Sequence, residues 1–302
     1  METTREARDG GKTGSEASTT VGALGETLAA KYARLRTILH DLQSVLVAYS
    51  GGVDSALLLK VATDVLGARA VGALASSPAY DEEETTDAEQ LAERMGARLV
   101  RLQTDELDDP RYVANGADRC YFCKAELFEK LEPLARKLGL LAIAYGMNRD
   151  DRKDWRPGQR AAREHAVRAP LDEAELTKTD VRALARHLGL PVWDKPALAC
   201  YSSRIPYGTP VTVEALTQIG RAERALRQLG LRQVRVRHHG QVARIELDPT
   251  DFACLLEGEL REQVVSGVRA AGYLYVTLDL AGYRSGSLNE ALLRTNRTGA
   301  RE

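Results

Sequence analysis

The stretch SVLVAYSGGVDSALLLK, residues 44–60, decides the fold because its hydrophobic pattern changes from strand-like to helical within a few residues. The run SVLVAYS is short, apolar and β-rich, which predicts a buried strand ending at Ser50. The run DSALLLKVATDVLG has helical periodicity and stops at Gly67. Gly51 and Gly52 join the two runs. A strand that enters a helix through a glycine turn predicts the first unit of an α/β protein.

The same alternation continues on both sides of this unit. Residues 25–42 have helical spacing before the first strand. After it, strand-like and helical runs alternate, and they read ARAVGALAS (68–76), DEEETTDAEQLAERMG (81–96), ARLVRLQT (97–104), KAELFEKLEPLARKLG (124–139) and LAIAYGMN (141–148). This order predicts a parallel sheet with helices on both faces and ligands bound at the carboxyl ends of the strands.

A different pattern begins after Pro206. A helix over 212–229, a hairpin QVRVRHHGQVARIEL (233–247), a helix over 250–272 and a strand over 273–280 predict a smaller C-terminal α+β domain. We therefore expect four parts, which are a disordered tail (1–22), an α/β domain (23–208), the α+β domain (209–290) and a second tail (291–302).

Bulk composition points to an ordinary globular protein. With 42 basic and 43 acidic residues the chain has almost no net charge to attract nucleic acid, which argues against such a partner. The first residues lack the apolar core of a signal peptide, and no run reaches the roughly 18 apolar residues of a membrane helix. We expect a cytoplasmic protein, in which four cysteines favour chemistry or metal binding over disulfides.

The glycine loop has the features of a phosphate cradle. Ser50, Gly51, Gly52, Asp54 and Ser55 lie where a helix N-terminus offers free N–H groups, and two serines add hydroxyl donors. Neither the G-x-x-x-x-G-K-[ST] nor the G-x-G-x-x-G pattern is present. The string SGGVDS resembles the PP-loop of the ATP pyrophosphatase superfamily, which implies an adenine nucleotide alpha hydrolase-like fold, ATP bound on these residues, and cleavage between its α and β phosphates. The alternative is a glycine turn that only joins strand to helix.

The cysteines are the second candidate feature. Cys120 and Cys123, in RCYFCKAELF just ahead of a helical run, are compatible with a disulfide, half a zinc site, a redox couple or part of an iron–sulfur ligand set. Cys200, in ACYSSRIPYG, is a third thiol in a predicted loop after the β-like run LPVW. Cys254 lies among apolar residues in DFACLLEGEL, which predicts a core position.

Two long strings carry a more specific resemblance. GMNRDDRKDWRPGQRAAREHAVRAPLDE (146–173) and VWDKPALACYSSRIPYGTP (192–210) closely resemble the LarE family of ATP-dependent sulfur transferases, which make the thiocarboxylates of the nickel-pincer nucleotide cofactor used in lactate racemase maturation. The resemblance continues through VRVRHHGQVARIEL and DLAGYRSGSLNE, so it covers about residues 42–290. Met147, Trp155 and the Tyr201–Ser202 pair depart from the family pattern, which bears on substrate placement.

The resemblance implies a reaction in two stages. ATP, with Mg²⁺ on its phosphates, adenylates a carboxylate of pyridinium-3,5-dicarboxylate mononucleotide and releases pyrophosphate; a sulfur nucleophile then displaces AMP. In one branch of the family the cysteine at the Cys200 position gives up its own sulfur. In the other, three cysteines matching Cys120, Cys123 and Cys200 hold a 4Fe-4S cluster whose free iron carries a transferable sulfide. The chain has all three; a zinc site, a sacrificial Cys200 with an idle pair, or buried thiols stay open.

Further candidates flank Cys200 and the hairpin. Ser203 is expected to hydrogen-bond the adenylate or only its own turn. Arg204 is expected to grip a substrate carboxylate or phosphate, or to form a salt bridge at the domain junction. Arg235 and Arg237 alternate on one strand, so they share a face and form a candidate clamp for the substrate phosphate, with a solvated strand face as the alternative. Two carboxylates near the clamp are possible ligands of a divalent cation, Glu223 and Glu246.

Other functions fit parts of the sequence. A PP-loop tRNA thiolation enzyme is one, although the chain lacks extra zinc-binding cysteine pairs and a basic module. A synthetase that uses ammonia and a non-catalytic ATP-binding module are others. The family resemblance also implies a homo-oligomer, in whose assembly or substrate binding residues 209–290 would serve, and contacts with other proteins of nickel-pincer biosynthesis.

Overall fold

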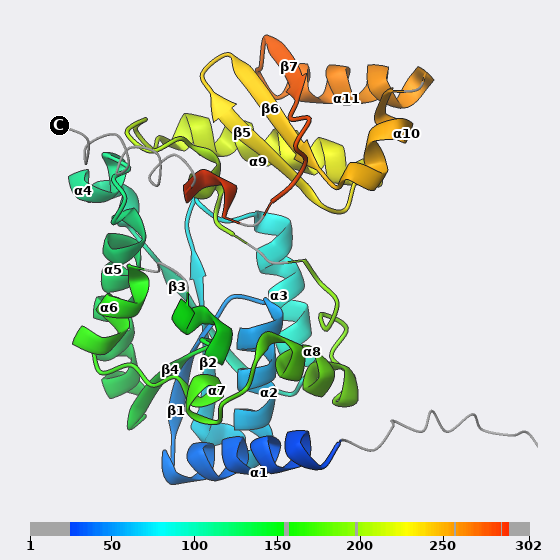
Figure 1. Ribbon diagram of the computed structural model, residues 1–302. Coiled ribbons are helices and arrows are strands. Elements are labelled where there is room, and N and C mark those ends of the chain that lie inside the picture. The colour runs from blue at the N-terminus through cyan, green and yellow to red at the C-terminus, as the bar shows by residue number, and fades with distance from the viewer. Residues whose placement is uncertain (1–24, 154–156, 197–198, 257, 285, 290–302) are drawn as a thin grey trace, which may run out of the picture.

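Two sheets organise the chain in the computed structural model, which describes residues 25–153, 157–196, 199–256, 258–284 and 286–289 (Figure 1). The tails expected at residues 1–22 and 291–302 lie outside these ranges, as does Trp155. No helix in the described part combines the length and apolar character needed to cross a membrane.

The larger sheet has four parallel strands in the order β3-β2-β1-β4. The strands are β1 (Val45–Tyr49), β2 (Ala70–Ser76), β3 (Arg98–Gln103) and β4 (Ala142–Tyr145). The chain moves outward from β1 to β2 and β3, and then returns to the other side of β1. The strand order therefore reverses beside β1, and the loop after β1 lies at the point where ligands bind in such sheets.

Helices cover both faces of this sheet, as predicted. Alternate β1 residues point to opposite faces, so Val45 and Val47 pack toward one group of helices and Leu46 toward the other. The first group comprises α1 (Glu26–Asp41), α2 (Val53–Leu66), α3 (Glu82–Arg94) and α8 (Lys178–His187). The second group comprises α5 (Arg119–Leu138) and α6 (Gly158–Glu164). Two single-turn helices, α4 (Pro110–Val113) and α7 (Pro170–Glu173), lie in the connections.

The smaller sheet belongs to an α+β unit, also as predicted. Its order is β5-β6-β7, with β5 (Val234–His239) antiparallel to β6 (Val242–Leu247) and β7 (Tyr275–Leu278) parallel to β6. The helices α9 (Val213–Gln228), α10 (Phe252–Leu256) and α11 (Gly258–Ala270) accompany it, and their apolar residues form a separate core. Figure 1 shows this unit above the larger sheet.

Three expected elements differ from the observed ones. The single helix over 250–272 is two helices, because Gly258 has a left-handed φ of 52° that an uninterrupted helix cannot contain. The run LPVW enters a turn and forms no strand; the carbonyl of its Trp193, and that of Lys195 just after the turn, accept hydrogen bonds from Arg182. Helix α5 begins at Arg119, so the cysteine pair lies within its first turns and not ahead of it. Tertiary packing outweighs the modest helix propensity of this segment.

Gly51 brings the loop after β1 against α3. Its φ of 73° is left-handed, and a Cβ added there would lie 2.6 Å from the Cβ of Ala88. Only glycine satisfies both the backbone conformation and the close approach.

Gly51→Ala is therefore expected to destabilise the protein more than a left-handed conformation alone explains. We expect a loss of about 1–2 kcal/mol from the backbone and about 1–3 kcal/mol more from overpacking, measured by urea denaturation. The matched control is Gly139→Ala, where φ is 67° but no atom of the described residues comes within 4 Å of an added Cβ. Equal losses in the two variants would contradict the close approach.

Candidate functional site

The loop after β1 is closed by its own serines. The Ser50 N–H donates to Ser55 Oγ at 3.1 Å, and Ser55 Oγ donates to the Gly52 carbonyl at 3.1 Å. Within the described ranges no side chain caps the N-terminus of α2, which begins directly after Gly52. The loop thus presents uncapped helix N–H groups and the positive end of the helix dipole, an arrangement suited to an anion.

Asp54 in this loop joins two elements that are distant in sequence. Asn148, which follows β4, donates from Nδ2 to Asp54 Oδ1 at 3.0 Å, and Lys178 at the start of α8 pairs with Oδ2. Gly146 allows the approach, since a Cβ there would lie 2.8 Å from the Ser55 nitrogen. Sequence reasoning missed Asn148 and Lys178; the position of Asn148 at the carboxyl end of a predicted strand was the available signal.

The acidic loop after β4 is ordered by its own carboxylates. Asp151 accepts from the Asn148 N–H at 3.0 Å, and Asp150 accepts from the Lys178 N–H at 2.8 Å. Met147, one of the departures from the family pattern, accepts a hydrogen bond from Tyr145 Oη at 2.8 Å. These contacts hold the end of β4 against the loop that carries Asp54.

The three cysteines of interest come from two segments. Cys120 and Cys123 are three residues apart on α5, so they share a helix face, and Cys200 precedes the 3₁₀ turn Tyr201–Arg204. All three thiols are free. Cys123 and Cys200 pack against one buried cluster that includes Tyr112. The structure therefore brings the pair on α5 and the loop of Cys200 together.

Charge interactions describe the same neighbourhood. Burial raises the pKa of Cys123 to about 12; Lys124 opposes this rise, and negative charge on Cys200 adds to it. Burial acts to lower the pKa of Arg119, but negative charge on Cys200 and Cys120 outweighs it and raises that pKa. The three sulfurs and one guanidinium thus interact electrostatically at one place.

The three thiols have the donor chemistry of an iron–sulfur cluster. Among the described residues, no three His, Cys, Asp or Glu side chains are grouped so as to hold a metal ion. Cysteine thiolates are the usual ligands of iron–sulfur clusters. The donor set contains sulfur only, which suits that group.

The Cys200 loop is tied to the larger sheet and to its own turn. The Tyr201 N–H donates to the carbonyl of Ala79, which follows β2, at 2.9 Å. The Cys200 carbonyl accepts from Ser203 Oγ at 2.8 Å and from Arg204 Nη1 at 2.9 Å. Ser203 thus makes the turn contact that was one of its two expected roles, and it fixes the backbone of Cys200.

Arg204 and Glu223 form a buried ion pair between the Cys200 loop and α9. Nε and Nη2 of Arg204 donate to the two carboxylate oxygens of Glu223 at 2.8 and 2.9 Å, and the side chains are 2% and 0% exposed. Burial acts to raise the pKa of Glu223, but the charge of Arg204 outweighs it and holds that pKa below its ordinary value. The Val236 N–H of β5 also donates to Glu223 at 3.0 Å.

A second carboxylate extends this network to the larger sheet. Asp81, the N-cap of α3, accepts hydrogen bonds from Tyr201 and, at 2.8 Å, from Arg227 of α9. Arg227 also donates to Glu223 at 3.0 Å. The network of Asp81, Tyr201, Arg204, Glu223 and Arg227 therefore connects both sheets to the segment that carries Cys200; we call it the junction network.

The predicted phosphate clamp lies on the face of β5 next to this network. Arg237 pairs with both oxygens of Glu246 at 2.9 and 2.7 Å and donates to the Ser203 carbonyl at 2.7 Å. Arg235 is buried beside the ring of Tyr283. The carboxylate oxygens of Glu223 and Glu246 accept hydrogen bonds from guanidinium groups. The role predicted for these two residues, as ligands of a divalent cation, stays a prediction.

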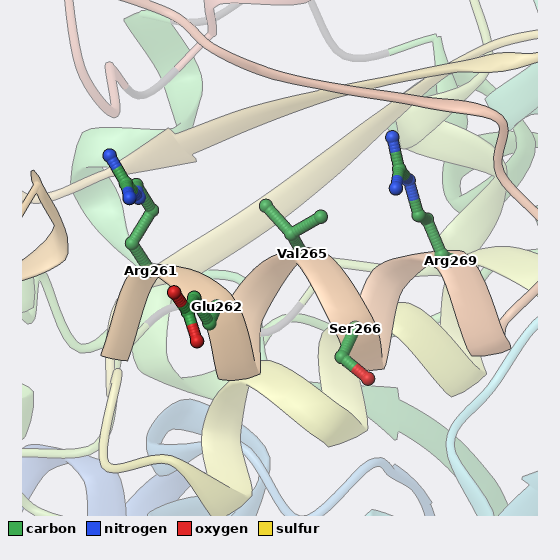
Figure 2. A pocket seen from close by; sticks show the side chains of 5 residues that line it. All are labelled: Arg261, Glu262, Val265, Ser266 and Arg269. Carbon is green, nitrogen blue, oxygen red and sulfur yellow. The ribbon is translucent and has the colours of Figure 1, made fainter. Parts of the chain in front are cut away.

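Two other features lie apart from these residues. Cys254 was expected in the core but is exposed, because the short helix α10 turns its neighbour Leu255 inward and Cys254 outward. A surface hollow on α11 is lined by residues of that helix alone, as Figure 2 shows, and it contains none of the site residues described above.

The buried pair at the junction yields a stability prediction. Glu223→Gln should cost about 3–5 kcal/mol, because it leaves the Arg204 guanidinium buried without its counter-charge. Glu175→Gln is the control, since its pair with Arg149 is half exposed and is worth about 1 kcal/mol or less. Urea denaturation measures both, and similar losses would show that the junction pair is not a main support.

Comparisons with known proteins agree with this arrangement. A family model described as NAD synthase matches residues 30–113. An uncharacterized protein of Synechocystis is 48% identical over 88% of this chain and 100% of its own length. The pyridinium-3,5-bisthiocarboxylic acid mononucleotide synthase of Lactiplantibacillus plantarum is 43% identical over 89% of this chain and 97% of its own length.

An identity of this level over nearly the whole of both proteins is a family relationship, and the matched NAD synthase region contains the glycine loop. The chain belongs to the LarE family of PP-loop proteins, the family of the pyridinium-3,5-bisthiocarboxylic acid mononucleotide synthase.

Proposed function

We propose that this chain is an ATP-dependent sulfur transferase that converts the carboxylates of pyridinium-3,5-dicarboxylate mononucleotide into thiocarboxylates. The observation that supports it most is the neighbourhood of Cys120, Cys123 and Cys200 at the same edge of the sheet as a phosphate-binding loop. A carboxylate resists a sulfur nucleophile until its oxygen becomes part of a good leaving group, so the two features serve one reaction.

The first stage uses the loop after β1. The N–H groups at the start of α2 and the hydroxyls of Ser50 and Ser55 would hold the terminal phosphates of ATP. Asp54 is the nearby carboxylate that would face Mg²⁺ on those phosphates, with Lys178 held beside it. A substrate carboxylate oxygen attacks the α phosphorus, the bond to pyrophosphate breaks, and an acyl adenylate results.

The second stage uses the cysteines. A sulfur lone pair forms a bond to the acyl carbon, and the carbon–oxygen bond to AMP breaks, with the electron pair leaving on AMP. A 4Fe-4S cluster on the three thiolates would supply an anionic sulfide on the iron without a protein ligand. Ser203 and Arg204 would keep the Cys200 carbonyl, and hence its thiol, in place through their hydrogen bonds.

The substrate would extend from the cysteines toward the smaller sheet. Arg235 and Arg237 share a face of β5, and Arg237 contacts the Ser203 carbonyl, so a phosphate bound there would lie beside the Cys200 loop. This gives residues 209–290 the part of a substrate domain. We also propose that the chain forms a homo-oligomer and contacts other proteins of nickel-pincer biosynthesis.

An assay of AMP, pyrophosphate and thiocarboxylate, formed from ATP and the dicarboxylate nucleotide under anaerobic conditions with sulfide, tests the function. Native protein should form all three products. Cys200→Ala and Cys120→Ala should each lose more than tenfold in thiocarboxylate formation but still form the adenylate. Cys254→Ala is the control, since its exposed thiol lies outside the site.

The variants also separate the sulfur routes. Loss in Cys200→Ala alone would indicate that Cys200 gives up its own sulfur and that the pair on α5 is idle. Full activity in Cys200→Ala with ammonia as the nucleophile would instead contradict sulfur transfer and favour an amide-forming synthetase.

A further inference from the structure

Arg119 is a buried cation at the start of α5 that the proposed reaction leaves without a role. Its side chain is 2% exposed. Nη1 donates to Asn115 Oδ1 at 2.5 Å and to the Ser202 carbonyl at 2.8 Å. The guanidinium therefore lies between the helix that carries Cys120 and the loop that carries Cys200.

The charge of Arg119 has no acidic partner in the part of the chain that the structure describes. The buried guanidinium groups of Arg204 and Arg237 each pair with a carboxylate, whereas the contacts of Arg119 are to an amide, a carbonyl and a sulfur. Burying a guanidinium without a counter-charge is costly, because the lost hydration is not replaced. An anion is therefore expected beside it.

Sulfur is the atom that can supply this anion. Arg119 Nη2 is directed at Cys120 Sγ at 3.9 Å, within reach of a weak hydrogen bond to sulfur. Its contact with Ser202 places the same guanidinium two residues along the chain from Cys200. The ring of Tyr207 is 5.8 Å from the guanidinium carbon, and the phenols of Tyr207 and Tyr112 are uncharged in their ordinary state.

We propose that Arg119 is the fixed counter-charge of the anionic sulfur at the Cys120–Cys200 site, an inference that rests on the proposed sulfur transfer. The transferable sulfur is anionic whether it is a cysteine thiolate or a sulfide. A guanidinium held in place by Asn115 and Ser202 stabilises that anion without reorganising, and more strongly than it would in water. Arg119 is a positioning residue, because it acts through the sulfur and not on the substrate.

The first test compares Arg119→Gln and Arg119→Lys with the native full-length protein after anaerobic reconstitution with iron and sulfide. The readout is the midpoint potential of the cluster, followed by electron paramagnetic resonance. Losing a nearby positive charge disfavours the added electron, so Arg119→Gln should shift to lower potential and Arg119→Lys should stay near native. An unshifted potential in Arg119→Gln would overturn the proposal.

A second readout does not need the cluster. In metal-free protein, iodoacetamide should alkylate Cys120 and Cys200 several-fold more slowly in Arg119→Gln than in native protein or Arg119→Lys, because the reagent attacks thiolates. The exposed Cys254 serves as the internal control and should react equally in all three. If native protein binds no iron, the cluster hypothesis is wrong, but this comparison still tests the role of Arg119. Alkylation of Cys120 and Cys200 at the same rates in Arg119→Gln as in native protein would refute that role.

Thermal unfolding separates this role from a merely structural one. In the part of the chain that the structure describes, Arg119→Gln removes no partner of a buried carboxylate, so its melting temperature should fall less than that of Arg204→Gln, which removes both Arg204 hydrogen bonds from the buried Glu223 carboxylate. A larger fall in Arg119→Gln, or its failure to fold, would make Arg119 a structural residue and would contradict the proposal.

Discussion

The buried ion pair between Arg204 and Glu223 is the constraint on which the site depends. Arg204 donates three hydrogen bonds within its own loop, to the carbonyls of Ala199 and Cys200 and to the hydroxyl of Ser203. It donates two more to the Glu223 carboxylate on α9. A pair this deeply buried is stable only when every donor and oxygen is matched. The position of Cys200 is therefore set by the smaller domain as well as by the sheet that binds the nucleotide.

The parallel sheet supplies the second half of the arrangement. Its strand order reverses beside β1, so the glycine loop, the end of β4 and the segment after β2 meet at one edge. Asp54 links the glycine loop to the end of β4 through Asn148 and to the start of α8 through Lys178. The Ala79 carbonyl links the segment after β2 to Tyr201. Activation of a carboxylate and delivery of sulfur can occur at one edge of the sheet because these segments are joined by hydrogen bonds.

Much of this was predictable from the sequence, for physical reasons. Hydrophobic periodicity gave the alternating strands and helices, since each buried face needs its own spacing, and the motifs gave the family. Contacts between distant side chains have no such periodic signal, so the contacts of Asn148 and Lys178 with Asp54 were not predicted. A salt bridge of Arg204 at the domain junction was one of two expectations, but its partner Glu223 and the links to Asp81 and Arg227 were not. Cys254 was misassigned because a short helix does not bury every apolar neighbour, and α5 starts early because Arg119 is anchored by tertiary contacts.

The mass of the peptide that contains Cys200, measured after product formation, tests the shared three-thiol site most directly. Native protein is supplied with ATP, the dicarboxylate nucleotide and sulfide until more thiocarboxylate has formed than there are protein chains. We expect Cys200 to keep its full mass, because the sulfur passes through the site and is replaced. A Cys200 peptide lighter by one molecule of hydrogen sulfide, with product limited to one transfer per chain, would contradict this site and show that the protein consumes its own cysteine.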